Sequence, residues 1–168
     1  MVSSLRMVVA TVGILVLGQP LIYARSGQNK TQEDRLIARI AREQNPGKKA
    51  RLQLHLAKIK LSEAHEAYRA GNFAKGKALL QQYLAQVRET WATLQGADDG
   101  PRKHLGAYKE FEISLREEDR LLDDLSHQVP YPESESIEAV AKENRTVHNQ
   151  VLEAIFPADV SRKERSKR

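Results

Sequence analysis

The pair Gly71–Asn72 constrains the fold more than any other feature, because it lies between two stretches with the apolar spacing of helices. Glycine is the usual residue just past the end of a helix, since it adopts a left-handed conformation without strain at Cβ. Asparagine is a favoured N-cap, because its side chain accepts a hydrogen bond from a free N–H group of the next helix. We therefore predict that one helix ends at Ala70, that another begins at Phe73, and that the two form an antiparallel hairpin.

The residues of this hairpin resemble the middle of a tetratricopeptide (TPR) repeat. That family marks its inter-helix turn with two small residues, a glycine, an asparagine or aspartate, and an aromatic residue. Here those places are held by Ala64, Ala67, Gly71, Asn72 and Phe73. The sequence departs from the pattern at Gly76, where alanine is usual, and at Tyr83, where a small residue is usual. The pattern occurs once, whereas an array needs about three copies of a ~34-residue period, so the resemblance implies a single TPR-like hairpin.

Composition and apolar spacing predict an all-α fold. Aromatic residues make up only 5% of the chain, and residues with high helix propensity dominate. Apolar seams and helix-terminating residues place helices at 31–44, 46–70, 73–95, 103–127 and 134–155. Because the connections are short, consecutive helices are expected to be neighbours. We expect an antiparallel bundle of four long helices plus a short N-terminal helix, with the TPR-like hairpin at its centre.

Residues 1–24 have the pattern of a secretory signal peptide. Arg6 precedes an apolar run from Met7 to Leu17, and Ala24 supplies a small residue for cleavage. The alternative is an uncleaved membrane anchor, although the run is shorter than the ~20 residues that a span needs. We predict an exported protein, periplasmic or secreted, and the overall layout resembles small exported helical proteins of unassigned function from bacteria. The remaining predicted units are a polar leader (25–30), a helical bundle domain (31–157) and a basic disordered tail (158–168).

Charge and cysteine content exclude several classes of function. The chain has 168 residues, a formal net charge of +5 and no cysteine, so disulfides, thiolate zinc sites and cysteine nucleophiles are excluded. Five basic and two acidic residues lie in the tail 158–168, which leaves the folded body close to neutral. We therefore expect no nucleic-acid partner. The tail is either a solubilising end or a weak contact for anionic surfaces such as lipid headgroups.

No pattern of catalytic or metal-ligating residues emerges. The sequence contains neither His-Glu-x-x-His nor Glu-x-x-His, and its nearest match is Asp124-x-x-His127 at a predicted helix end. A histidine there is more simply explained by its favourable interaction with the helix dipole. Gly-x-Ser-x-Gly and a glycine-rich phosphate-binding loop are also absent. We predict that the protein is not an enzyme and has no cofactor or metal.

The leading hypothesis is a non-enzymatic module for protein–protein interaction, or a structural module, whose partner is another envelope or secreted protein. A groove between helices could receive a partner helix or peptide. The apolar side chains that we expect to remain exposed for such a contact are Leu79, Tyr83 and Tyr131.

The alternative hypothesis is a helical bundle that binds a small molecule or a metal. Its candidate polar pocket consists of Glu118, which lies on the seam of the helix 103–127, and of Asn144 and His148 in the last helix. The competing explanation is that a polar residue on an apolar seam specifies the register of helix packing.

Overall fold

The computed structural model describes residues 21–157, with side chains from residue 32 onward. Within this part of the chain every regular element is a helix, so the predicted all-α class is confirmed. The helices are α1 (Leu21–Arg42), α2 (Pro46–Arg69), α3 (Phe73–Gln95), α4 (Gly100–Lys103), α5 (Leu105–His127) and α6 (Tyr131–Ile155).

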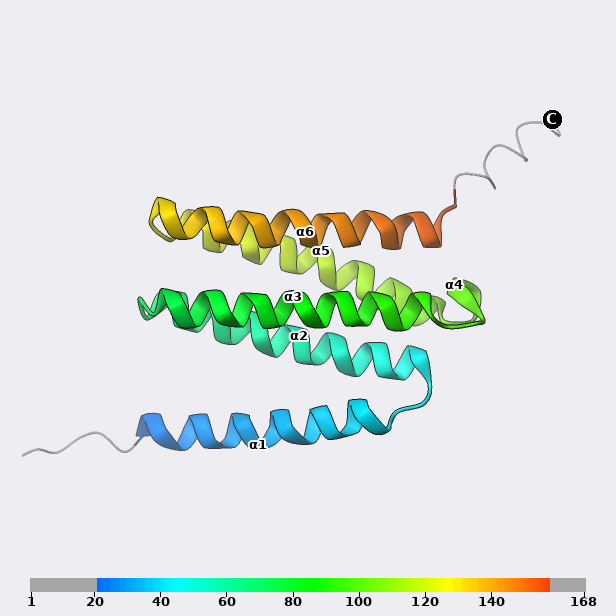
Figure 1. Cartoon of the computed structure of the whole chain (residues 1–168), viewed down its shortest axis with the longest axis horizontal. Helices are drawn as coiled ribbons and strands as arrows, with labels where there is room; N and C mark the ends of the chain where they lie inside the picture. The colour runs from blue at the N-terminus through cyan, green and yellow to red at the C-terminus, as the bar shows by residue number, and fades with distance from the viewer. Residues whose placement is uncertain (1–20, 158–168) are drawn as a thin grey trace, which may run out of the picture.

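Two helical hairpins form most of the structure. Figure 1 shows α1, the hairpin of α2 and α3, and the hairpin of α5 and α6 lying side by side. Besides the pairing within each hairpin, α3 packs on α6, α2 packs on α5, and α1 packs on α2. Each of α2, α3, α5 and α6 therefore packs against at least two other helices, and the apolar core lies among these four.

The predicted junction between α2 and α3 is confirmed. Gly71 has a left-handed backbone with φ of 73°, and the Asn72 side chain accepts a hydrogen bond from the Lys75 backbone N–H at 3.2 Å. At the other end of α2, Asn45 accepts one from the Lys48 N–H at 2.9 Å. These caps satisfy N–H groups that have no partner inside their own helix.

The predicted start of the first helix is wrong. Helix α1 begins at Leu21, well before Thr31, so the predicted polar leader 25–30 lies inside a helix. No proline occurs between Pro20 and Pro46, and the capping signal at Thr31 does not by itself end a helix. Residues 1–20 of the predicted signal peptide and the predicted tail 158–168 lie outside the described residues, so those predictions remain open.

Two further boundaries differ from the prediction. The short helix α4 occupies half of the connection 97–102 that was predicted without a helix, and α6 begins at Tyr131 rather than at Ser134. Pro132 was expected to precede the last helix but lies in its first turn. Proline is tolerated there because the N–H that it lacks would have no partner within the helix.

Gly76 lies in α3 at a close approach to α2. A Cβ atom added at Gly76 would come within 2.6 Å of two ring carbons of Tyr68, which is closer than real Cβ contacts allow. Tyr68 in turn packs against Phe73, with ring centroids 6.1 Å apart. The departure from alanine at position 76 therefore has a local cause, since the Tyr68 ring occupies the space of a side chain.

Candidate functional site

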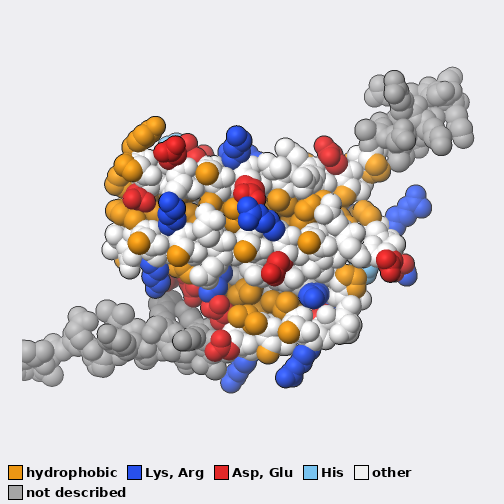
Figure 2. All heavy atoms as spheres, viewed as in Figure 1, with side chains coloured by type: hydrophobic (Ala, Val, Ile, Leu, Met, Phe, Trp, Pro, Cys, Tyr) orange, Lys and Arg blue, Asp and Glu red, His pale blue; other side chains and the backbone are white. Residues whose placement is uncertain are grey.

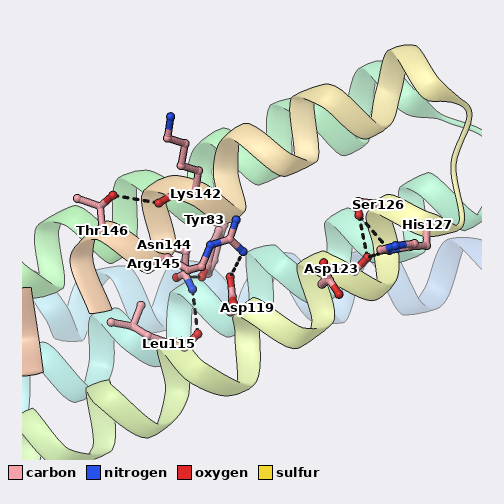
Figure 3. A network of polar contacts seen from close by, with 10 residues as sticks. All are labelled: Tyr83, Leu115, Asp119, Asp123, Ser126, His127, Lys142, Asn144, Arg145 and Thr146. Atoms are coloured by element: carbon pink, nitrogen blue, oxygen red, sulfur yellow. Dashed lines mark hydrogen bonds and ion pairs between the residues drawn. The ribbon is translucent and has the colours of Figure 1, made fainter. Parts of the chain in front are cut away.

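A buried polar cluster lies where α3, α5 and α6 meet, and we define it by Tyr83, Glu118 and Asn144. Tyr83 and Asn144 are 0% exposed and Glu118 is 2% exposed. The Tyr83 hydroxyl oxygen lies 3.0 Å from Glu118 Oε2 and 2.6 Å from Asn144 Oδ1. Ser114 Oγ donates to Glu118 Oε1 at 2.8 Å. Asn144 Nδ2 donates to the Leu115 carbonyl oxygen at 2.8 Å, as Figure 3 shows.

The number of protons in this cluster favours a neutral Glu118. The Tyr83 hydroxyl has one proton, so it cannot donate to both Glu118 and Asn144. If Glu118 carries a proton on Oε2, it donates to Tyr83, which then donates to Asn144, and both contacts of the Tyr83 hydroxyl are satisfied. If Glu118 is ionised, two acceptors share one proton, and an unpaired buried acceptor is unfavourable.

Burial raises the pKa of Glu118 from 4.5 to about 7, because the carboxylate loses its hydration. Hydrogen bonds from Ser114 and Tyr83 and the charge of Lys58 lower this pKa, whereas the charge of Glu117 raises it further. Burial, followed by the charge of Glu118, also raises the pKa of Tyr83 well above its usual value of 10.0. Near neutral pH, Glu118 therefore populates both protonation states while Tyr83 keeps its proton.

A pocket of ≈ 320 Å³ opens between α2 and α5 and reaches this cluster. Glu118 belongs to both the cluster and the pocket lining, so it connects the interior to an accessible surface. Leu121 is 51% exposed at the pocket and adds apolar surface to its rim. The lining residues are Lys58, Leu61, Ser62 and His65 of α2 and Glu117, Glu118, Leu121 and Leu125 of α5.

Opposite charges face the pocket without meeting. Among the described residues, neither Lys58 of α2 nor Glu117 of α5 forms an ion pair. Ion pairs do join α3 to α6, α5 to α6, and α2 to α5 at a distance from the pocket. They include Arg88–Glu143, Arg145–Asp119 at 2.8 Å and Arg51–Glu110 at 2.6 Å. The pocket therefore offers an apolar floor with one basic and one acidic edge.

The expectation that Leu79 and Tyr83 are exposed is wrong. Leu79 is buried in the core, and Tyr83 is fully buried in the polar cluster. The reason is that α3 packs against both α2 and α6, so its buried surface is wider than the single seam of Leu80, Leu84 and Val87. Tyr131 is 83% exposed, as expected, at the start of α6.

The three residues of the predicted polar pocket do not all come together. Glu118 and Asn144 meet through Tyr83, whereas His148 Nε2 lies 3.0 Å from Glu112 Oε1 on the same helix interface. His148 therefore belongs to a separate polar contact between α5 and α6. The link supplied by Tyr83 was not predicted, because the sequence led us to expect this side chain on the exposed surface, whereas it is fully buried.

The remaining histidine candidate, His127, contacts the backbone of its own helix. His127 Nδ1 lies 2.7 Å from the backbone carbonyl oxygen of Asp123 at the end of α5 (Figure 3). Among the side chains of residues 32–157, no group of three or more potential ligands is placed to hold a metal ion. In the same part of the chain, no helix combines the length and the apolar character that a membrane span requires.

Charged side chains of both signs are mixed on the face of the molecule formed by α3 and α6 (Figure 2). Figure 2 shows basic and acidic side chains interspersed over the face formed by α3 and α6, with small apolar groups between them. This face presents no large area of a single charge.

Comparisons with protein-family models, with curated proteins and with solved structures find no match for this chain.

Proposed function

We propose that this is an exported, non-enzymatic protein that binds another envelope or secreted protein through the groove between α2 and α5. In this proposal the four long helices form an antiparallel bundle, and the α2–α3 hairpin is TPR-like. The observation that carries the proposal is the α2–α5 pocket, where exposed Leu121 borders a hollow with a mainly apolar lining. Exposed apolar surface in a concave site is typical of binding sites.

The partner element that suits this groove is an amphipathic helix. An apolar side chain of the partner would pack against Leu61, Leu121 and Leu125. An acidic side chain of the partner would face Lys58, and a basic one would face Glu117, since neither has an ion-pair partner among the described residues. Recognition of a helix in a groove uses such regularly spaced anchors.

A charge substitution at the pocket tests the proposal. Residues 25–168 with Leu121→Lys are compared with the unchanged chain for capture of proteins from envelope extract of the native cell. The matched control is Ile113→Lys, on the same helix, because Ile113 is 42% exposed and does not line the pocket. We expect one partner to be lost with Leu121→Lys and retained with Ile113→Lys. Equal loss or equal retention with both variants contradicts the proposal.

The second candidate function, binding of a small molecule, is favoured by the connection of the pocket to Glu118. The volume of ≈ 320 Å³ is at the lower end of the range of small-molecule sites. A compound that binds the folded state alone raises the melting temperature. A melting shift that Leu121→Lys abolishes, together with no captured protein, would support this candidate instead.

A further inference from the structure

Glu118 lines the α2–α5 pocket, and its side chain is buried. Among the described residues, no lysine, arginine or histidine forms an ion pair with Glu118. Its hydrogen-bond partners, Ser114 and Tyr83, are both uncharged. A buried carboxylate in this position requires either a proton or a cation to neutralise it.

We propose that the pocket receives a primary alkylammonium group, supplied by a lysine side chain of the partner protein. This inference rests on the proposed function, because the lysine belongs to the protein bound in the groove. The methylene chain of the lysine packs against Leu61, Leu121 and Leu125, and its ammonium group lies at the carboxylates of Glu117 and Glu118. Lysine suits such a site because its long stem covers apolar surface while its charge stays at the polar end.

The groups that face Glu118 come from every helix packed around it, and most of them are uncharged. They are Lys58 and His65 of α2, Tyr83 of α3, Ser114 and Glu117 of α5, and Asn144 of α6. Lys58 is exposed and is the one permanent cation among them. It opposes the entry of a second cation, so its removal should strengthen binding of an amine.

Binding of the ammonium group is coupled to the proton of Glu118. The cation stabilises the ionised carboxylate, so a protonated Glu118 releases its proton to solvent when the amine binds. Affinity for the amine therefore rises with pH, whereas affinity for a neutral molecule of the same shape does not.

The test is a titration of residues 25–168 with n-butylamine, the side-chain analogue of lysine, followed by amide NMR signals. Butanol and butyrate serve as neutral and anionic probes with chains of similar length. At about pH 8 we expect butylamine to shift the signals of Leu61 and Leu121 and to bind about tenfold more tightly than either other probe. At about pH 5.5 we expect this preference to fall about tenfold, because Glu118 is then largely protonated.

Four variants test which residues cause the preference for butylamine and its pH dependence. Glu118→Gln should abolish the preference for butylamine over butanol, and Glu110→Gln, an exposed position on the same helix, should preserve it. Lys58→Gln should strengthen butylamine binding, and His65→Asn should keep the pH dependence. Equal or tighter binding of butanol or butyrate overturns the proposal, and so does a preference for the amine that survives Glu118→Gln in a folded variant.

The two experiments distinguish a failure of the lysine inference from a failure of the proposed protein-binding function. If a partner is lost with Leu121→Lys but butylamine does not bind, the protein-binding function stands and the lysine inference fails. If butylamine binds as expected and no protein is captured, the pocket chemistry stands and its source is a free amine, which overturns the assignment to a partner lysine.

Discussion

Glu118 is the residue whose properties most clearly link stability to pH. The unfolded chain has the ordinary glutamate pKa of 4.5, and burial raises the pKa in the folded state to about 7. The folded state therefore holds this proton more tightly than the unfolded state does. The resulting stabilisation is fully present below about pH 4.5 and is lost as pH rises through about 7.

We predict that the wild-type chain loses about 3 kcal/mol of its free energy of unfolding between pH 4.5 and a pH well above 7 through Glu118. Glu118→Gln remains neutral, so the variant should lack this part of the pH dependence. Urea unfolding of both proteins at several pH values gives the difference directly. Parallel pH profiles for the two proteins would show that Glu118 is not protonated in the folded state.

The Tyr83 hydroxyl holds together two buried polar groups. In Tyr83→Phe, Glu118 Oε2 and Asn144 Oδ1 lose their shared partner while the ring remains. We predict a loss of about 1–3 kcal/mol in the free energy of unfolding. Tyr131→Phe is the matched control, because Tyr131 is exposed, and it should change stability by less than about 0.5 kcal/mol. Equal stability of both variants would rule out the cluster as a stabilising network.

At the scale of helices, the contact between α2 and α3 depends on the missing side chain at Gly76. Gly76→Ala gains helix propensity of about 1 kcal/mol but places Cβ 2.6 Å from the Tyr68 ring. We predict net destabilisation of about 1–3 kcal/mol, because overpacking forces neighbouring groups to move. Thermal unfolding of the variant and the wild-type chain measures this loss of stability.

Gly106→Ala provides the comparison, since the atom nearest to its new Cβ is the flexible end of Arg51, at 3.0 Å. The stability of Gly106→Ala should equal or slightly exceed that of the wild-type chain. A Gly76→Ala protein as stable as Gly106→Ala would mean that Tyr68 moves aside without cost.

Local signals in the sequence were sufficient to predict most helix boundaries. Gly71 and Asn72 gave the turn, and the helix predicted at 73–95 has the bounds of α3. These local signals could not show that α3 packs against α6 as well as α2. Leu79 and Tyr83 therefore looked exposed from the sequence.

The candidate site was only partly predictable for a similar reason. The seam positions of Glu118 and Asn144 indicated a buried polar pair, and both are buried. Their shared partner comes from a third helix, and His148 turns to Glu112 instead. The pocket beside them arises from the separation of α2 and α5, which depends on side-chain packing and has no local sequence signal.

At the scale of the whole molecule, the predicted export determines whether the functional protein begins at Arg25 or at Met1. We expect the protein expressed in its native cell to be cleaved after Ala24, with a mature N-terminus at Arg25. Mass spectrometry of the intact protein from the envelope fraction measures this. An N-terminus at Met1 together with retention in the membrane would favour the alternative of an uncleaved anchor.

The groove between α2 and α5 is the central claim, and site-specific photo-crosslinking tests it most directly. A photoreactive amino acid replaces Leu121 at the pocket in one protein and Ile113, away from it, in another. We predict that position 121 forms a crosslink to one defined protein in intact cells and that position 113 does not. A crosslink to that protein at 113 alone, or the same crosslinks at both positions, would contradict the assignment of the binding site to this groove.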